Sequence, residues 1–176
     1  MTTPHAGHAY PGELAIEIQG RFRSITDPGL TGEQDSTGGH PLSEARLAGL
    51  CAQWDGYISR LADFVLFAAD SASYCANYTM VESKTLRHIH RLSLDRQIEQ
   101  LEMMCPDFII TEDNRQQLRE LALALHAVNV NSRATARSNM AHTDIERWHA
   151  MLAALVATSA AAIARKYSNA GHYIPA

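Results

Sequence analysis

Residues 47–68, with the sequence LAGLCAQWDGYISRLADFVLFA, decide the fold of this chain. Their large apolar side chains recur at steps of three and four residues, and that spacing places them on one face of a helix. Ser43 comes just before this run and is a good helix N-cap residue. The pattern predicts one long amphipathic helix from about residue 43 to residue 77.

Further helices are predicted after this one. Residues 81–92 form a short helix, and Ser93 caps a second helix that Pro106 stops. Thr111 caps a third, which runs from Glu112 to about Met140, and the last helix covers about 144 to 168. The sequence therefore predicts an all-α protein, an up-and-down helical bundle of about five helices.

The N-terminal part has a different pattern. We expect residues 1–42 to be a partly flexible extension and residues 43–176 to be the bundle domain. Residues 13–25 alternate between apolar and polar side chains, with Leu14, Ile16, Ile18 and Phe22 on one side. A period of two predicts a β-strand or a short hairpin arm here, followed by a linker over residues 28–41.

Composition narrows the function classes. The chain has 176 residues and a formal net charge of −4, so it lacks the overall basic field typical of proteins that bind nucleic acid through net charge. Arginine greatly outnumbers lysine, which leaves a local phosphate-binding patch open.

Cysteine usage and hydropathy suggest the compartment. The chain has three well-separated cysteines and no Cys-x-x-Cys pair, so we expect neither a zinc site nor a disulfide framework. No signal peptide is recognisable, and the uncharged run over residues 150–164 is shorter than the roughly 20 apolar residues a bilayer needs. These features predict a cytoplasmic protein without a membrane segment.

The polar stretch RATARSNMAHTDIERWH, residues 133–149, is the candidate functional site. Arg137 and His142 suit phosphodiester chemistry, because a guanidinium holds phosphate oxygens and a histidine moves protons to or from a ribose hydroxyl. RNA supplies its own 2′-hydroxyl nucleophile, so this chemistry needs no metal. The spacing between Arg137 and His142 is a weak signal by itself, because the same Arg-to-His spacing also arises by chance in a chain with this many arginines and histidines. In the alternative interpretation, Arg137 is a solvated helix-end residue and His142 bonds a helix-terminal carbonyl.

The sequence context strengthens the first interpretation. The segments LSLDRQIEQL, residues 92–101, and ARSNMAHTD, residues 136–144, resemble the HEPN superfamily of helical domains. The resemblance implies a homodimer that binds RNA or nucleotides, often a metal-independent endoribonuclease of the toxin or defence type. Arg137 and His142 would be its catalytic pair. The chain departs from the family pattern at Ser138, where Asn, Asp or His usually follows the arginine.

The resemblance also implies a set of accessory residues and partners. Arg133, Ser138, Asn139 and Asp144 would contact phosphate or RNA, and an antitoxin or regulatory protein would be a partner. No cofactor is expected. Many family members are non-catalytic, so the alternative function is a helical dimerisation or protein-interaction module. Arg137 and His142 lie about 140° apart on a continuous helix. Catalysis therefore requires a joint near residue 142 or a second subunit.

Three other groups of residues are candidates for a function. Glu146-x-x-His149, together with His142, resembles part of a di-iron site, but the chain has no second Glu-x-x-His, and we predict no metal. His126, among Leu and Ala, is predicted to be a partly buried core or interface histidine. A solvated basic face, or a secondary patch for the RNA backbone, is predicted for Arg87, His88, His90 and Arg91.

Overall fold

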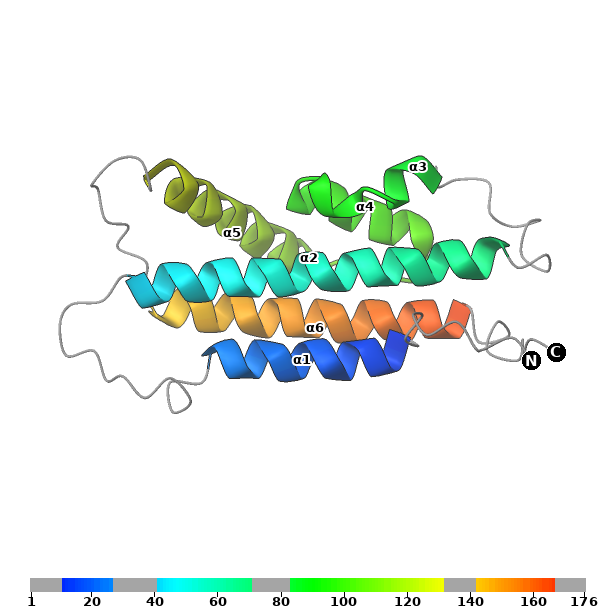
Figure 1. Ribbon diagram of the computed structural model, residues 1–176, viewed down its shortest axis with the longest axis horizontal. Helices are drawn as coiled ribbons and strands as arrows, with labels where there is room; N and C mark the ends of the chain where they lie inside the picture. Colours follow the sequence, from blue (N-terminus) through cyan, green and yellow to red (C-terminus); the bar gives the residue numbers. More distant parts are fainter. Residues whose placement is uncertain (1–10, 27–40, 71–82, 132–141, 167–176) are drawn as a thin grey trace, which may run out of the picture.

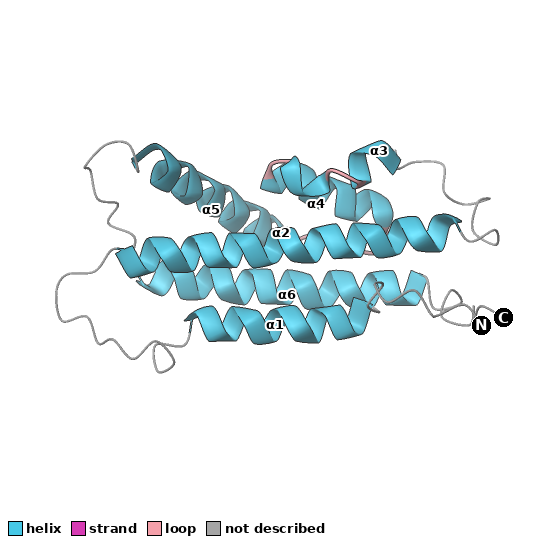
Figure 2. Cartoon of the chain, in the orientation of Figure 1, coloured by secondary structure: helices cyan, strands magenta, loops and turns pink. Residues whose placement is uncertain are grey.

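The computed structural model describes residues 11–26, 41–70, 83–131 and 142–166. Within these ranges the chain forms helices joined by short loops, and no strand occurs (Figure 2). The elements in chain order are α1 (Pro11–Thr26), α2 (Pro41–Asp70), α3 (Ser83–Leu86), the 3-10 helix η1 (Ile89–Arg91), α4 (Leu94–Met104), α5 (Glu112–Asn131) and α6 (His142–Lys166). The predicted all-α helical bundle is confirmed.

The prediction of a strand over residues 13–25 is wrong, because these residues belong to helix α1. Leu14, Ile18 and Phe22, spaced by four, are almost fully buried, whereas Ile16 is 74% exposed. Leu14, Ile16 and Ile18 fit a period of two, but the residues that are buried follow the helical period. Pro11 at the first helical position suits a helix start, because its fixed φ is already helical.

Helix α1 also belongs to the bundle, although the sequence analysis placed residues 1–42 in an extension. Its buried side chains share one core with those of α2 and α6. Gln19 donates to the carbonyl oxygen of Ala153 at 3.2 Å, and Arg60 donates to both carboxylate oxygens of Glu17 at 2.9 Å. Residues 11–26 thus form part of the folded domain.

Helices α1, α2 and α6 pack against one another, each in contact with the other two, and together form the first layer of the molecule (Figure 1). The order of their contacts gives their directions, because Glu17 meets Arg60 while Arg21 meets Gln53. Helix α1 is therefore antiparallel to α2, and its Gln19–Ala153 contact and the Phe22–His149 ring contact make it antiparallel to α6 as well. Helices α2 and α6 consequently run in the same direction.

Helices α3, α4 and α5, with η1, form a second layer over α2 (Figure 1). Helix α4 ends at Met104, just before Pro106, as predicted. The backbone N–H of Asn114 donates to the Thr111 hydroxyl at 3.2 Å, so the predicted cap of α5 is confirmed. Ser93 occupies the N-cap position of α4, but its side chain makes no capping hydrogen bond.

A buried tyrosine links the centre of α2 to α6. Tyr57 is fully buried, and its hydroxyl lies 3.1 Å from the Val156 carbonyl oxygen and 2.7 Å from the Ser159 hydroxyl. Among the described residues, α6 is the one helix long and apolar enough to cross a membrane by length and composition, over its residues Thr143–Lys166. About half of that apolar window is buried inside the bundle, where α1 and α2 pack against it.

Candidate functional site

Most of the predicted catalytic stretch lies outside the described residues. Arg133, Arg137, Ser138 and Asn139 fall in the range 132–141 between α5 and α6. His142 is the first residue of α6, and its side chain is not among those described. The predicted start of the last helix, near residue 144, agrees with the observed start to within two residues.

Asp144 is the described member of the predicted site. It lies in the first turn of α6, where the helix dipole favours a carboxylate. Its Oδ1 is 3.5 Å from Nη2 of Arg147, and the same Nη2 donates to Glu120 of α5 at 2.6 Å. The first turns of α6 are therefore tied to α5 through Arg147, a residue that the sequence analysis did not single out.

His149 does not take part in a metal site within the described residues. No group of three His, Cys, Asp or Glu side chains there is arranged to hold a metal ion. The His149 ring instead packs edge-on against Phe22 of α1, with ring centroids 5.9 Å apart. Its Nε2 is buried and has no hydrogen-bond partner among the residues that the structure describes. Burial, the nearby Arg23 charge and, in the opposite direction, Glu146 together lower the pKa of His149.

A second site, which the sequence analysis missed, lies between α2, the η1–α4 segment and α5. It is a cavity of about 270 Å³. Its walls are mainly apolar, and its polar lining residues are Asp55, His90, Ser93, Gln97 and His126. Apolar walls with a few fixed polar groups are typical of small-molecule pockets.

Gln97 holds the polar floor of this cavity in place. Its side chain is 1% exposed, and each of its polar atoms has a partner. The indole N–H of Trp54 donates to its Oε1 at 2.6 Å. Its Nε2 donates to Oδ1 of Asp55 at 2.9 Å and to the carbonyl oxygen of Leu92 at 3.2 Å. The Asp55 carboxylate is thereby fixed from α4 while it faces the cavity.

The electrostatics of the cavity favour a held carboxylate over a reactive thiol. Burial raises the pKa of Asp55, while the hydrogen bond from Gln97 and the nearby His90 oppose the shift. Burial, and then the Asp55 charge, raise the pKa of the Cys51 thiol to about 12. Cys51 is therefore a neutral thiol at pH 7 and not an activated nucleophile.

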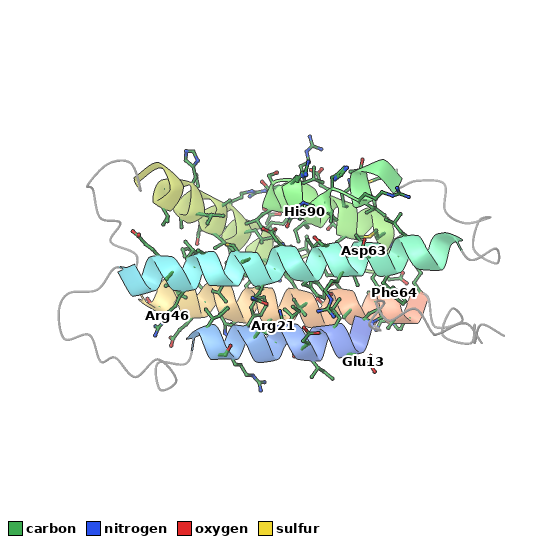
Figure 3. All side chains as sticks on the ribbon, in the orientation of Figure 1. Glu13, Arg21, Arg46, Asp63, Phe64 and His90 are labelled. Carbon is green, nitrogen blue, oxygen red and sulfur yellow. The ribbon has the colours of Figure 1, made fainter. Side chains whose placement is uncertain are left out.

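The rim of the cavity carries exposed polar side chains. His90 and His126 line the cavity and are both exposed, so the prediction of a partly buried core position for His126 is wrong, and the alternative of an interface histidine stays a prediction. Figure 3 shows His90 on the side of α2 that faces α4. Arg87, His88 and Arg91 are also exposed, as both a solvated basic face and a patch for the RNA backbone require.

The sequence did contain one signal for this cavity. Gln97 stands within the apolar stripe of α4, between Leu94 and Leu101, at a position where a polar side chain needs partners. The identity of those partners depends on the tertiary fold, because Trp54 and Asp55 are more than forty residues away in the chain.

Comparisons with protein-family models, curated proteins and solved structures found no match to this chain. The resemblance to HEPN domains thus depends on the chain's own residues, chiefly the segment 136–144.

Proposed function

We propose that this protein is a HEPN-like, RNA-binding helical domain that cleaves RNA without a metal, using Arg137 and His142 in a homodimer. The observation that carries the proposal is the separation of α5 from α6. Helix α5 is described to Asn131, a distinct α6 begins at His142, and the two helices are paired through Glu120 and Arg147. A single continuous helix through residue 150 would have held Arg137 and His142 on different faces.

The surroundings of the proposed catalytic pair also support the proposal. His142 opens a helix whose first turn carries Asp144, a carboxylate that the N-terminal end of the helix dipole stabilises. The Arg147–Glu120 ion pair holds that turn against α5. Arg133 and Arg137 belong to the stretch that leads into this turn, so their positive charges add to a local site in a chain of net negative charge.

In the proposed reaction the ribose 2′-oxygen attacks the adjacent phosphorus atom, and the bond from phosphorus to the 5′-oxygen breaks. The products are a 2′,3′-cyclic phosphate and a free 5′-hydroxyl. The Arg137 guanidinium stabilises the charge that develops on the non-bridging oxygens. His142 takes the proton from the attacking 2′-hydroxyl or gives a proton to the leaving 5′-oxygen, so that overall one proton passes from the 2′-oxygen to the 5′-oxygen, and Ser138 and Asn139 orient the phosphate.

Cleavage of a mixed-sequence single-stranded RNA in excess EDTA tests the proposal. We expect the wild-type protein to cleave and both Arg137→Ala and His142→Ala to lose cleavage. Arg119→Ala is the matched control, because Arg119 is an exposed arginine on α5 whose ion pair is with Glu112. Absence of cleavage by well-folded wild-type protein would favour the alternative, a non-catalytic interaction module.

A further inference from the structure

We propose that the cavity between α2, η1–α4 and α5 is a base-recognition pocket that binds guanine, with Asp55 as the residue that reads the base. This inference rests on the proposed function for its biological setting, since it assigns a sequence preference to an RNA-binding domain. The side chains that line the pocket all belong to the part of the chain that the structure describes.

The Asp55 carboxylate is held in place through one of its two oxygens. Its Oδ1 accepts one hydrogen bond from Gln97, and within the described part of the chain its Oδ2 accepts none. Gln97 is in turn held by Trp54 and by the Leu92 carbonyl. A carboxylate fixed in this way, at the floor of a cavity, is preorganised to accept hydrogen bonds from a ligand.

The Asp55 carboxylate complements the hydrogen-bond donors of guanine better than those of the other bases. A carboxylate accepts two parallel hydrogen bonds from adjacent N–H donors, as it does from a guanidinium. On its Watson–Crick edge guanine offers such a pair, N1–H and N2–H. Uracil offers one N–H between two carbonyl groups, while adenine and cytosine each place a ring acceptor beside their amino group. Asp55 therefore discriminates in favour of guanine and against the other three bases.

The shape and lining of the pocket also suit a base with its phosphate. The apolar wall residues are those against which a base can pack, namely Leu92, Leu94, Ala122 and Leu125. A volume of about 270 Å³ accommodates a base and leaves its sugar and phosphate at the rim. The rim carries His90 and His126, and Arg87 and Arg91 are exposed on the adjacent segment. A negative floor below a basic rim complements a nucleotide.

The pocket also lies near the proposed cleavage site along the chain. His126 on α5 is five residues before Asn131, about 7.5 Å along the helix axis. The residues that follow Asn131 include Arg133 and Arg137.

Binding of single nucleotides by the full chain, measured by calorimetry in EDTA, tests the inference. We expect guanosine monophosphate to bind about tenfold or more tightly than the adenosine, cytidine and uridine monophosphates, the scale of one good base-reading pair. Asp55→Asn should lose that preference. Asp63→Asn is the matched control, because Asp63 is exposed on the same helix, eight residues further on (Figure 3), and it should keep the preference.

Two outcomes would overturn the inference. One is guanosine monophosphate binding that is absent from the wild type or unchanged in Asp55→Asn. The other is equally tight binding of agmatine, which would make the pocket a site for organic cations.

The test also separates this inference from the proposed nuclease. Arg137→Ala and His142→Ala should retain guanosine monophosphate binding even though they lose cleavage. Binding that depends on Asp55, in a protein that cleaves no RNA, would uphold the pocket and overturn the nuclease. Cleavage of RNA by a protein that shows no Asp55-dependent preference for guanosine monophosphate would uphold the nuclease and overturn the pocket.

Discussion

The indole N–H of Trp54 on α2 donates to Oε1 of Gln97 on α4 at 2.6 Å, inside the bundle and away from solvent. This hydrogen bond joins the two layers of the molecule. It also fixes the amide orientation of Gln97, so that the Nε2 of Gln97 points at Asp55 and Leu92. A buried amide with all its partners satisfied specifies one arrangement of the helices around it.

Replacement of Gln97 should therefore destabilise the protein. Gln97→Ala leaves the buried Trp54 N–H without an acceptor, and we expect the free energy of unfolding to fall by about 2 kcal/mol or more. Urea denaturation measures this change. Gln100→Ala is the control, because the Gln100 amide contacts the Met103 sulfur on the exposed surface of α4. A loss of equal size in both variants would contradict the role assigned to Gln97.

The helical structure of α1 predicts that replacing two of its apolar residues by alanine changes the stability by very different amounts. Phe22 is fully buried, so Phe22→Ala should cost about 3–5 kcal/mol of stability. Ile16 is 74% exposed, so Ile16→Ala should change the stability by less than about 0.5 kcal/mol. In a strand both side chains would lie on one face and both changes would be costly. Thermal or urea unfolding of the two variants distinguishes the two structures.

His149 should make the stability depend on pH. The pKa of His149 in the folded protein lies below the usual 6.5, and burial is the largest cause of this shift. The unfolded chain therefore binds the proton more readily than the folded protein does. The stabilising contribution is complete above pH 6.5 and is lost as the pH falls through the folded pKa. In His149→Phe, which keeps a ring against Phe22, the decline of stability from pH 7 to pH 5 should be shallower. An unchanged slope in this variant would contradict the prediction.

The Asp55 carboxylate should lower the stability of the folded protein, although the proposed binding of guanine requires it. Burial raises the pKa of Asp55 above its usual 3.8, with Gln97 and His90 opposing the shift, so ionisation in the folded state costs free energy. That cost is absent below pH 3.8 and complete above the raised pKa. Asp55→Asn can still accept the hydrogen bond from Gln97, and at pH 7 it should be more stable than the wild type. A lower melting temperature for Asp55→Asn at pH 7 would contradict this account.

The fold was predictable to the extent that each helix carries its own apolar stripe. Trp54, Ile58, Leu61 and Val65 mark α2 without reference to the rest of the chain. The residues of helix α1 predict a strand because Leu14, Ile16 and Ile18 fit a period of two over five residues, while Leu14 and Ile18 alone also fit the helical period. Contact with α6, through Gln19 and Phe22, is what selects the helix.

The two candidate sites differ in how far the sequence could reveal them. Arg137 and His142 are close in the chain, so their motif can be found by inspection, and their catalytic role stays a prediction. The Asp55 pocket is assembled from segments around residues 55, 97 and 126. No local pattern connects segments so far apart, and the fold alone brings them together.

The most direct test of the central claim is cleavage of single-stranded RNA in excess EDTA by the wild-type protein, Arg137→Ala and His142→Ala. The proposed function predicts cleavage by the wild type, with a 2′,3′-cyclic phosphate at the new end, and none by either variant. Equal cleavage by all three proteins, or none by a folded wild type, would contradict it.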